Sequence, residues 1–155
     1  GLRVGWLAAP EWLHGPLVRL KQAADLHTST LCQRMAVEVL SDQRFMDDHL
    51  SGLGPFYGQR GDALADAIEA ELGDRATFDR PDGGMFLWVR LVDSPRPARE
   101  LLPAAVEAGV AFVPGEAFFV DGSGGDRIRL SFATLTPDEL GEAANRLARA
   151  LTSAG

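Results

Sequence analysis

The sequence is poor in cysteine, histidine and lysine, and each shortage excludes a class of protein. Its 155 residues include one cysteine, Cys32, which cannot form an internal disulfide and is typical of the reducing cytoplasm, where we expect the protein. The three histidines are scattered and show no metal-ligand spacing near Cys32, so we expect no metal site. Lys21 is the only lysine among 15 basic residues.

Basic runs and long apolar runs are also absent. The formal net charge is −7, so we expect no nucleic-acid partner for this chain. No apolar stretch approaches the roughly 20 residues that cross a bilayer, so we expect no membrane partner, and we expect no signal peptide. The 46% of hydrophobic and 24% of charged residues are typical of a globular protein.

The first half predicts one strand followed by helices. We expect a strand over residues 2–8, a helix over 11–24, a second helix after the N-cap hydroxyls of 27–30, and a long helix over 41–72 that bends near Pro55. These helices are each expected to bury one face, yet they have no sheet of their own. Because the chain also lacks an initiator methionine, we expect further sequence upstream.

The second half predicts the order β, β, α, β, β, α. Strands are expected over 76–80, 85–91 and 110–114 and within 125–133. The helix between the second and third strands is expected to bury Leu101, Leu102, Ala105 and Val106, and the last helix to bury Leu140, Ala144, Leu147 and Leu151. Thr136 and Glu139 form a capping box around Pro137. The fold class is therefore α/β, with an α+β unit whose sheet is covered by helices on one face.

Several kinds of chemistry find no support. No G-x-S-x-G elbow is present, and Ser123 lies in a glycine-rich loop, "DGSGGD", that lacks the acidic spacing of a calcium loop. Paired carboxylates such as Asp47 and Asp48 fall on predicted helix surfaces, where they are solvated.

The arginines are better candidates for a site. In "GDRIRLSFA" (125–133), alternation places Ile128, Leu130 and Phe132 on one face and Arg129 in the middle of the other. An arginine there requires an anion, which is either an internal carboxylate or a ligand. Arg3 also interrupts an apolar segment, and for it a surface or structural role is favoured.

Five stretches in order carry a resemblance: "GLRVGWLAAP", Tyr57-x-x-Arg60, "PDGGMFLWVRL", "GVAFVPGEAFF" and "RIRLSFA". Together they resemble the C-terminal part of the fold-type-I (class I/II) aminotransferases that use pyridoxal 5′-phosphate (PLP), and they are most similar to the subgroup acting on 2-aminoadipate, aromatic or branched-chain amino acids. The resemblance covers essentially the whole chain and implies an aspartate-aminotransferase-like fold.

The resemblance also implies roles for residues. It assigns the PLP phosphate to Arg3 and the substrate α-carboxylate to Arg129, and it places Gly84 beside the substrate pocket, although a plain turn explains that glycine equally well. Residues 1–40 would belong to the large PLP-binding domain, 41–73 to a connecting helix, and 74–155 to the small domain.

One part of the family pattern is missing. The Schiff-base lysine is expected upstream of Gly1, and Lys21 does not replace it because it follows Arg3 and falls on an exposed helix face. We therefore expect this chain alone to be inactive and the intact protein to be a homodimeric, PLP-dependent aminotransferase of amino acids and 2-oxo acids. The alternative is the effector-binding domain of a bacterial transcription regulator with an aminotransferase-like domain.

Overall fold

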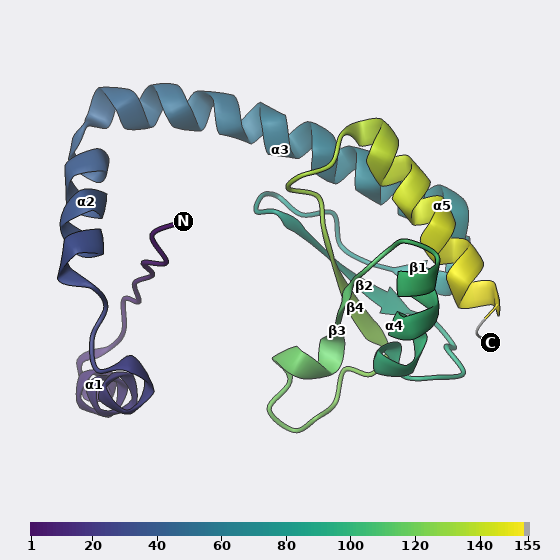
Figure 1. The fold of residues 1–155 in the computed structure, drawn as a ribbon, viewed down its shortest axis with the longest axis horizontal. Helices are drawn as coiled ribbons and strands as arrows, with labels where there is room; N and C mark the ends of the chain where they lie inside the picture. The colour runs from purple at the N-terminus through teal and green to yellow at the C-terminus, as the bar shows by residue number, and fades with distance from the viewer. Residues whose placement is uncertain (154–155) are drawn as a thin grey trace. The chain divides into compact units, whose positions relative to one another are not determined.

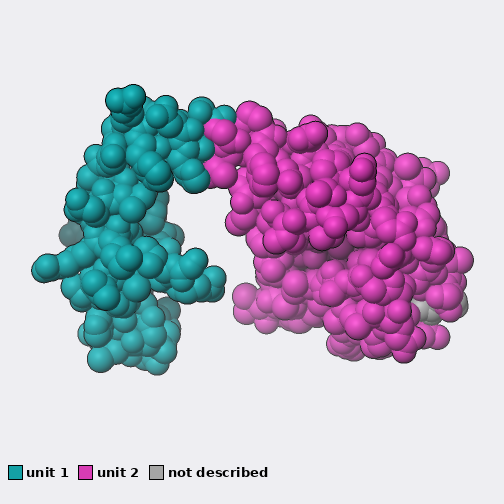
Figure 2. All heavy atoms as spheres, turned by 45° about the horizontal axis from the view of Figure 1, so that its top comes forward, with its two compact units in different colours: residues 1–51 teal, residues 52–155 magenta. Residues whose placement is uncertain are grey.

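The structure is a computed structural model that describes residues 1–153. Its elements run, in chain order, α1 (Glu11–Asp25), α2 (Thr30–Ser41), α3 (Gln43–Leu72), the 3-10 turn η1 (Gly73–Arg75), β1 (Ala76–Thr77), β2 (Phe86–Leu91), α4 (Ala98–Glu107), β3 (Val113–Pro114), the 3-10 turn η2 (Gly115–Phe118), β4 (Arg127–Ser131) and α5 (Pro137–Ser153) (Figure 1). Two compact units result, residues 1–51 and 52–155 (Figure 2).

The sheet of the second unit is antiparallel throughout, with the strand order β1-β2-β4-β3. Its central pair is β2 and β4, in which Leu87 lies opposite Leu130 and Trp88 lies opposite Arg129. The predicted order β, β, α, β, β, α and the α/β fold class are confirmed. The two edge strands are shorter than predicted, because β1 and β3 each pair over two residues only.

One face of this sheet is buried under helices. Alternate residues of β2 and β4 turn inward, and they meet the apolar faces of α3, α4 and α5 in one core. Its fully buried large side chains are Phe132, Ile68, Leu87, Ile128, Leu140, Leu147 and Val89. The expected inward position of Val106 is wrong, because this side chain on α4 is 55% exposed. The opposite face of the sheet therefore carries the polar and aromatic side chains.

The N-terminal capping box of α5 forms as predicted. The Thr136 backbone N–H donates to Glu139 Oε2 at 2.8 Å, and the Glu139 N–H donates to Thr136 Oγ1 at 3.4 Å. We expect Thr136→Ala to lower the free energy of unfolding by about 1 kcal/mol. Urea unfolding, followed through Trp88 in a chain with Trp6→Phe and Trp12→Phe, measures this; an unchanged midpoint would contradict it.

The same cap predicts a pH dependence. The backbone N–H of Thr136, and then its hydroxyl, hold the pKa of Glu139 below its ordinary value of 4.5. Because the folded pKa is depressed, the carboxylate stabilises the fold above the ordinary pKa, and this contribution is lost as the pH falls through the lower folded value. Glu139→Gln is therefore expected to unfold at lower urea than the parent chain at pH 7, with a difference that shrinks near about pH 4.

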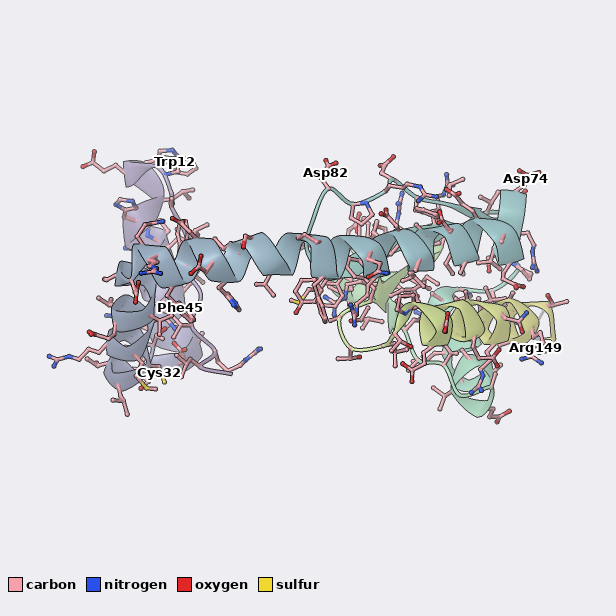
Figure 3. All side chains as sticks on the ribbon, turned by 90° about the horizontal axis from the view of Figure 1, so that it is seen from above. Trp12, Cys32, Phe45, Asp74, Asp82 and Arg149 are labelled. Atoms are coloured by element: carbon pink, nitrogen blue, oxygen red, sulfur yellow. The ribbon has the colours of Figure 1, made fainter. Side chains whose placement is uncertain are left out.

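The first unit differs from the sequence prediction in two ways. Residues 1–10 form no strand, since a strand needs a hydrogen-bonded neighbour and the described residues supply none for this segment. Helices α1 and α2 form where predicted, but neither contains a buried residue. Figure 3 shows the side chains of both helices, Trp12 and Cys32 among them, and Trp12 is 75% exposed. The expected burial of one face on each helix is therefore wrong for the described residues.

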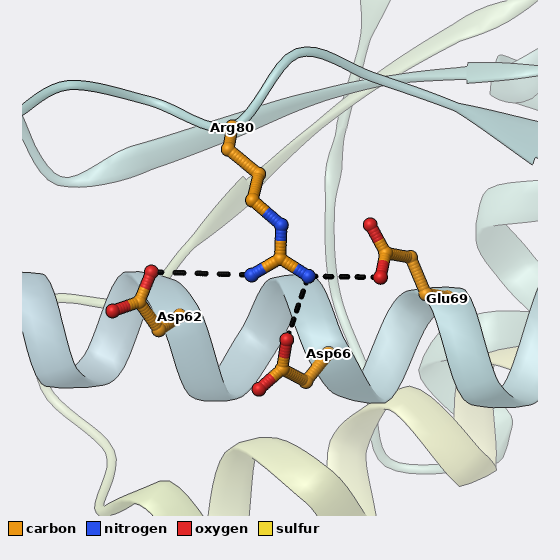
Figure 4. Close-up of polar contacts among 4 residues, drawn as sticks. All are labelled: Asp62, Asp66, Glu69 and Arg80. Atoms are coloured by element: carbon orange, nitrogen blue, oxygen red, sulfur yellow. Dashed lines mark hydrogen bonds and ion pairs between the residues drawn. The ribbon is translucent and has the colours of Figure 1, made fainter.

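Arg80 links the segment before β2 to the long helix α3 through ion pairs. Helix α3 continues through Pro55 without interruption. Near its C-terminal end, Arg80 Nη2 lies 2.6 Å from Asp66 Oδ1 and 2.8 Å from Glu69 Oε2, and Nη1 lies 4.0 Å from Asp62 Oδ1 (Figure 4). These hydrogen bonds, that to Asp66 most strongly, raise the pKa of Arg80. Arg80 thus attaches the segment before β2 to the helix.

No helix among the described residues is both long and apolar enough to cross a membrane.

Candidate functional site: an arginine held between aromatic rings

Arg129 lies in the middle of β4, on the sheet face opposite the helices. Its neighbours Ile128 and Leu130 turn into the core, so alternation directs Arg129 outward, as predicted. Its guanidinium carbon lies 4.1 Å from the ring centre of Phe86 and 4.7 Å from that of Phe118. The cation is therefore held by the faces of aromatic rings, which attract a guanidinium electrostatically.

No carboxylate in the described chain pairs with Arg129. Of the two anions that the sequence left open, the internal carboxylate is not found within 4.0 Å among residues 1–153. The Arg129 Nε atom is buried and has no hydrogen-bond partner there. A guanidinium without an anion in a partly buried position costs free energy, and a ligand anion recovers it.

The other arginines of this strand pair are engaged. Arg90 Nε lies 2.7 Å from Asp126 Oδ2, and Arg127 Nε lies 3.8 Å from Asp126 Oδ1. Arg127 shares the strand and the face of Arg129 but lies beside a carboxylate, that of Asp126, which also pairs with Arg90. The fold thus neutralises Arg127 with a carboxylate and leaves Arg129 available for a ligand anion.

Arg60, from the Tyr57-x-x-Arg60 motif, is also used by the fold. Its Nε donates to the Leu135 carbonyl at 3.0 Å, and its guanidinium lies 3.6 Å from the ring centre of Phe56. The arginine thereby fastens the segment that follows β4 to α3.

Gly84 lies in the turn that leads into β2, two residues before Phe86. Its φ of +84° is the left-handed conformation that glycine adopts without strain, and a Cβ there would meet no heavy atom within 4 Å. The turn by itself therefore accounts for this glycine, and its place beside a substrate pocket stays a prediction. Asp82 stands in the same turn (Figure 3).

Gly115 is different, because a close approach of backbone explains it. A Cβ on Gly115 would overlap the Gly124 carbonyl oxygen and lie 2.6 Å from Arg127 Cβ. Only glycine lets η2 and the loop 121–125 pack together at this point. Contacts within the chain thus account for this glycine.

Arg3 belongs to the first unit and is exposed, with a φ of 55°. It lines an open hollow of about 1000 Å³ together with His14, Lys21 and Asp25. Lys21 Nζ is paired with Asp25 Oδ2 at 2.6 Å across one helical turn. The exposed guanidinium suits a phosphate, and its role as a phosphate ligand stays a prediction.

The sequence prediction missed the aromatic rings around Arg129. Alternation along β2 turns Leu87 and Val89 inward and therefore turns Phe86 and Trp88 outward, onto the face of Arg129. Two large aromatic side chains on the outer face of a half-buried sheet were the available signal. The position of Phe118 depends on the 3-10 turn η2, which local spacing does not reveal.

Comparison with known proteins places the chain in a family. The family described as "Aminotransferase class I and II" matches residues 1–147. A 2-aminoadipate transaminase of Thermus thermophilus is 40% identical over 152 residues, which are 97% of this chain and 37% of that protein. An uncharacterized HTH-type transcriptional regulator of Bacillus subtilis is 35% identical over 133 residues, which are 86% of this chain and 27% of that protein.

A solved structure agrees with the fold. The crystal structure of an α-aminoadipate aminotransferase from Thermus thermophilus, in complex with N-(5′-phosphopyridoxyl)-L-leucine, matches 96% of this chain and 37% of that one, with 38% identity and a TM-score of 0.75. The chain thus spans a little over a third of the length of the two Thermus thermophilus proteins and about a quarter of the Bacillus subtilis protein. It belongs to the class I and II aminotransferase family.

Proposed function

We propose that this chain is the carboxy-terminal, substrate-carboxylate part of a PLP-dependent aminotransferase that moves an amino group between an amino acid and a 2-oxo acid. The observation that carries the proposal is Arg129, a cation that pairs with no carboxylate among residues 1–153 and faces outward against two rings. Both substrates of such a reaction carry a carboxylate beside the reacting carbon. A guanidinium binds that group with two parallel hydrogen bonds and so fixes its orientation.

The residues of this chain divide the binding work. Arg129 binds and orients the carboxylate, and Arg3 contributes positive charge for the cofactor phosphate. Bound PLP supplies the electron sink on which amino transfer depends. The only lysine, Lys21, forms an ion pair with Asp25 and is assigned no part in the chemistry. The proposal keeps the domain assignment expected from the sequence, with residues 1–40 in the large domain, 41–73 in the connecting helix and 74–155 in the small domain. It also keeps Gly84 beside the substrate, a homodimeric assembly and a cytoplasmic location.

A single-turnover experiment tests the proposed activity. Full-length protein loaded with PLP is mixed with amino acids in the absence of a 2-oxo acid, and the released 2-oxo acid is measured by chromatography. We expect about one 2-oxo acid per bound cofactor for at least one amino acid. Absence of any release across the twenty common amino acids and 2-aminoadipate would contradict an aminotransferase.

The second candidate is an effector-binding domain of a transcription regulator, favoured by the 35% identity to the Bacillus subtilis protein. This function predicts PLP binding without release of 2-oxo acid, together with an amine-dependent shift of the full-length protein on the DNA upstream of its own gene. The same single-turnover assay therefore separates the two candidates.

A further inference from the structure

The ring of Phe118 connects Arg129 to a wider aromatic cluster. Trp88 meets Phe118 edge-on, with ring centres 5.2 Å apart and an interplanar angle of 88°, and it stacks on Phe119 at 6.4 Å and 25°. Trp88 also lies directly opposite Arg129 in the strand register. The ring of Phe118 thus contacts both the ring of Trp88 and the guanidinium of Arg129.

The turn η2, which carries Phe118, packs closely against the loop 121–125. Besides the close approach at Gly115, a Cβ on Gly124 would overlap the ring of Phe119, and Gly124 has a φ of +82°. Glycines at both positions allow the loop 121–125 to lie against η2 and against Phe119. Phe118 therefore stands on a closely packed turn, and its ring contacts Trp88, while 46% of the residue is exposed.

Aromatic rings hold a cation differently from a carboxylate. A carboxylate would fix the guanidinium and also neutralise it, and a ligand anion would then have to displace it. Ring faces attract the cation by their quadrupole and leave its N–H donors free in the plane of the group. An arginine side chain loses rotamer freedom when it is ordered, and rings that order it beforehand remove that cost from ligand binding.

We propose that Phe118 is a positioning residue that, supported by Trp88, fixes the guanidinium of Arg129 in the orientation that receives the substrate carboxylate. The inference rests on the proposed function, in which Arg129 binds that carboxylate. Phe118 acts through Arg129, so its loss is expected to weaken substrate binding and to leave the chemical step unchanged.

The test uses full-length, PLP-loaded protein and steady-state kinetics with the best amino acid. Phe118→Leu is expected to raise KM about fivefold to tenfold, with kcat and the cofactor absorbance unchanged. Phe118→Tyr retains the ring face and is expected to restore KM to within about twofold of the parent. Val120→Ala, a truncation at a fully exposed position nearby, serves as the control and is expected to leave both constants unchanged.

A double variant separates this inference from the proposed function. In an Arg129→Gln background, Phe118→Leu is expected to add nothing to the increase in KM, because the group that it positions is gone. If Arg129→Gln raises KM but Phe118→Leu does not, or if the two increases multiply, or if Phe118→Tyr fails to rescue, the positioning role is wrong and the proposed function stands. If Arg129→Gln itself leaves KM unchanged, both are wrong.

Discussion

Replacing Arg129 by glutamine in the full-length, PLP-loaded protein is expected to lower kcat/KM for the amino acid about 100-fold, or ~3 kcal/mol. The glutamine amide keeps one donor but loses the charge and the paired hydrogen bonds to the carboxylate. The cofactor absorbance should be unchanged, because Arg129 is assigned to the substrate and Arg3 to the phosphate. Initial rates over a range of amino-acid concentrations measure the effect.

Arg127→Gln is the matched control for this substitution. It removes an arginine from the same strand and the same face, but one that is paired with Asp126. We expect less than about a threefold change in kcat/KM, since surface ion pairs contribute little. Equal losses in the two variants, or loss of the cofactor absorbance in Arg129→Gln alone, would contradict the assignment of Arg129.

Replacing Phe132 by alanine is expected to lower the free energy of unfolding of the chain by about 3–5 kcal/mol. Phe132 is 2% exposed, and its ring lies 3.3 Å from the position of a Cβ on Gly61 of α3. Truncation leaves a cavity between the end of the central strand and the helix, which the packed core cannot fill. Urea unfolding in the single-tryptophan background measures the loss.

Val106→Ala, at an exposed position on a helix that covers the core, is the control for Phe132→Ala. Its side chain on α4 is 55% exposed, so we expect a change of less than about 0.5 kcal/mol. The comparison also decides between the sequence prediction, in which Val106 faces inward, and the structure, in which it does not. A loss of several kcal/mol for Val106→Ala, or none for Phe132→Ala, would contradict this description of the core.

The second half of the fold followed from local patterns. Alternation in 86–91 and 127–131, the helical spacing of Leu140, Ala144 and Leu147, and the cap at Thr136 each point to the structure that forms. In these segments propensity, burial pattern and capping agree, so short-range information is sufficient. Strand lengths at the edges did not follow, because pairing depends on what lies beside β1 and β3.

The first half followed less well, for a physical reason. The helical spacing in α1 and α2 predicts which residues form the helices, but the burial of these helices depends on what packs against their apolar sides. Segment 2–8 has the composition of a strand, yet strand formation requires a partner across the ladder. Both errors come from inferring a tertiary environment from a local pattern.

The candidate site was predictable in part. Alternation alone identified Arg129 as a cation on the outer face that needs an anion. It could not decide between a carboxylate of the chain and a ligand, because ion pairs such as those of Asp126 with Arg90 and Arg127 depend on the folded structure. The rings of Phe86 and Phe118 reach Arg129 across strands and through a turn, and these contacts depend on the assembled sheet.

The central claim, that Arg129 is the binding site of the substrate carboxylate, is tested most directly by comparing an acid with its amide. The two ligands are the carboxylic acid obtained by removing the amino group from the preferred amino acid and its primary amide, which has the same shape without the charge. Their inhibition constants are measured on the full-length, PLP-loaded protein and on Arg129→Gln. We expect the parent to prefer the acid by about tenfold to 100-fold and the variant to bind both about equally. An undiminished preference for the acid in Arg129→Gln would contradict the claim.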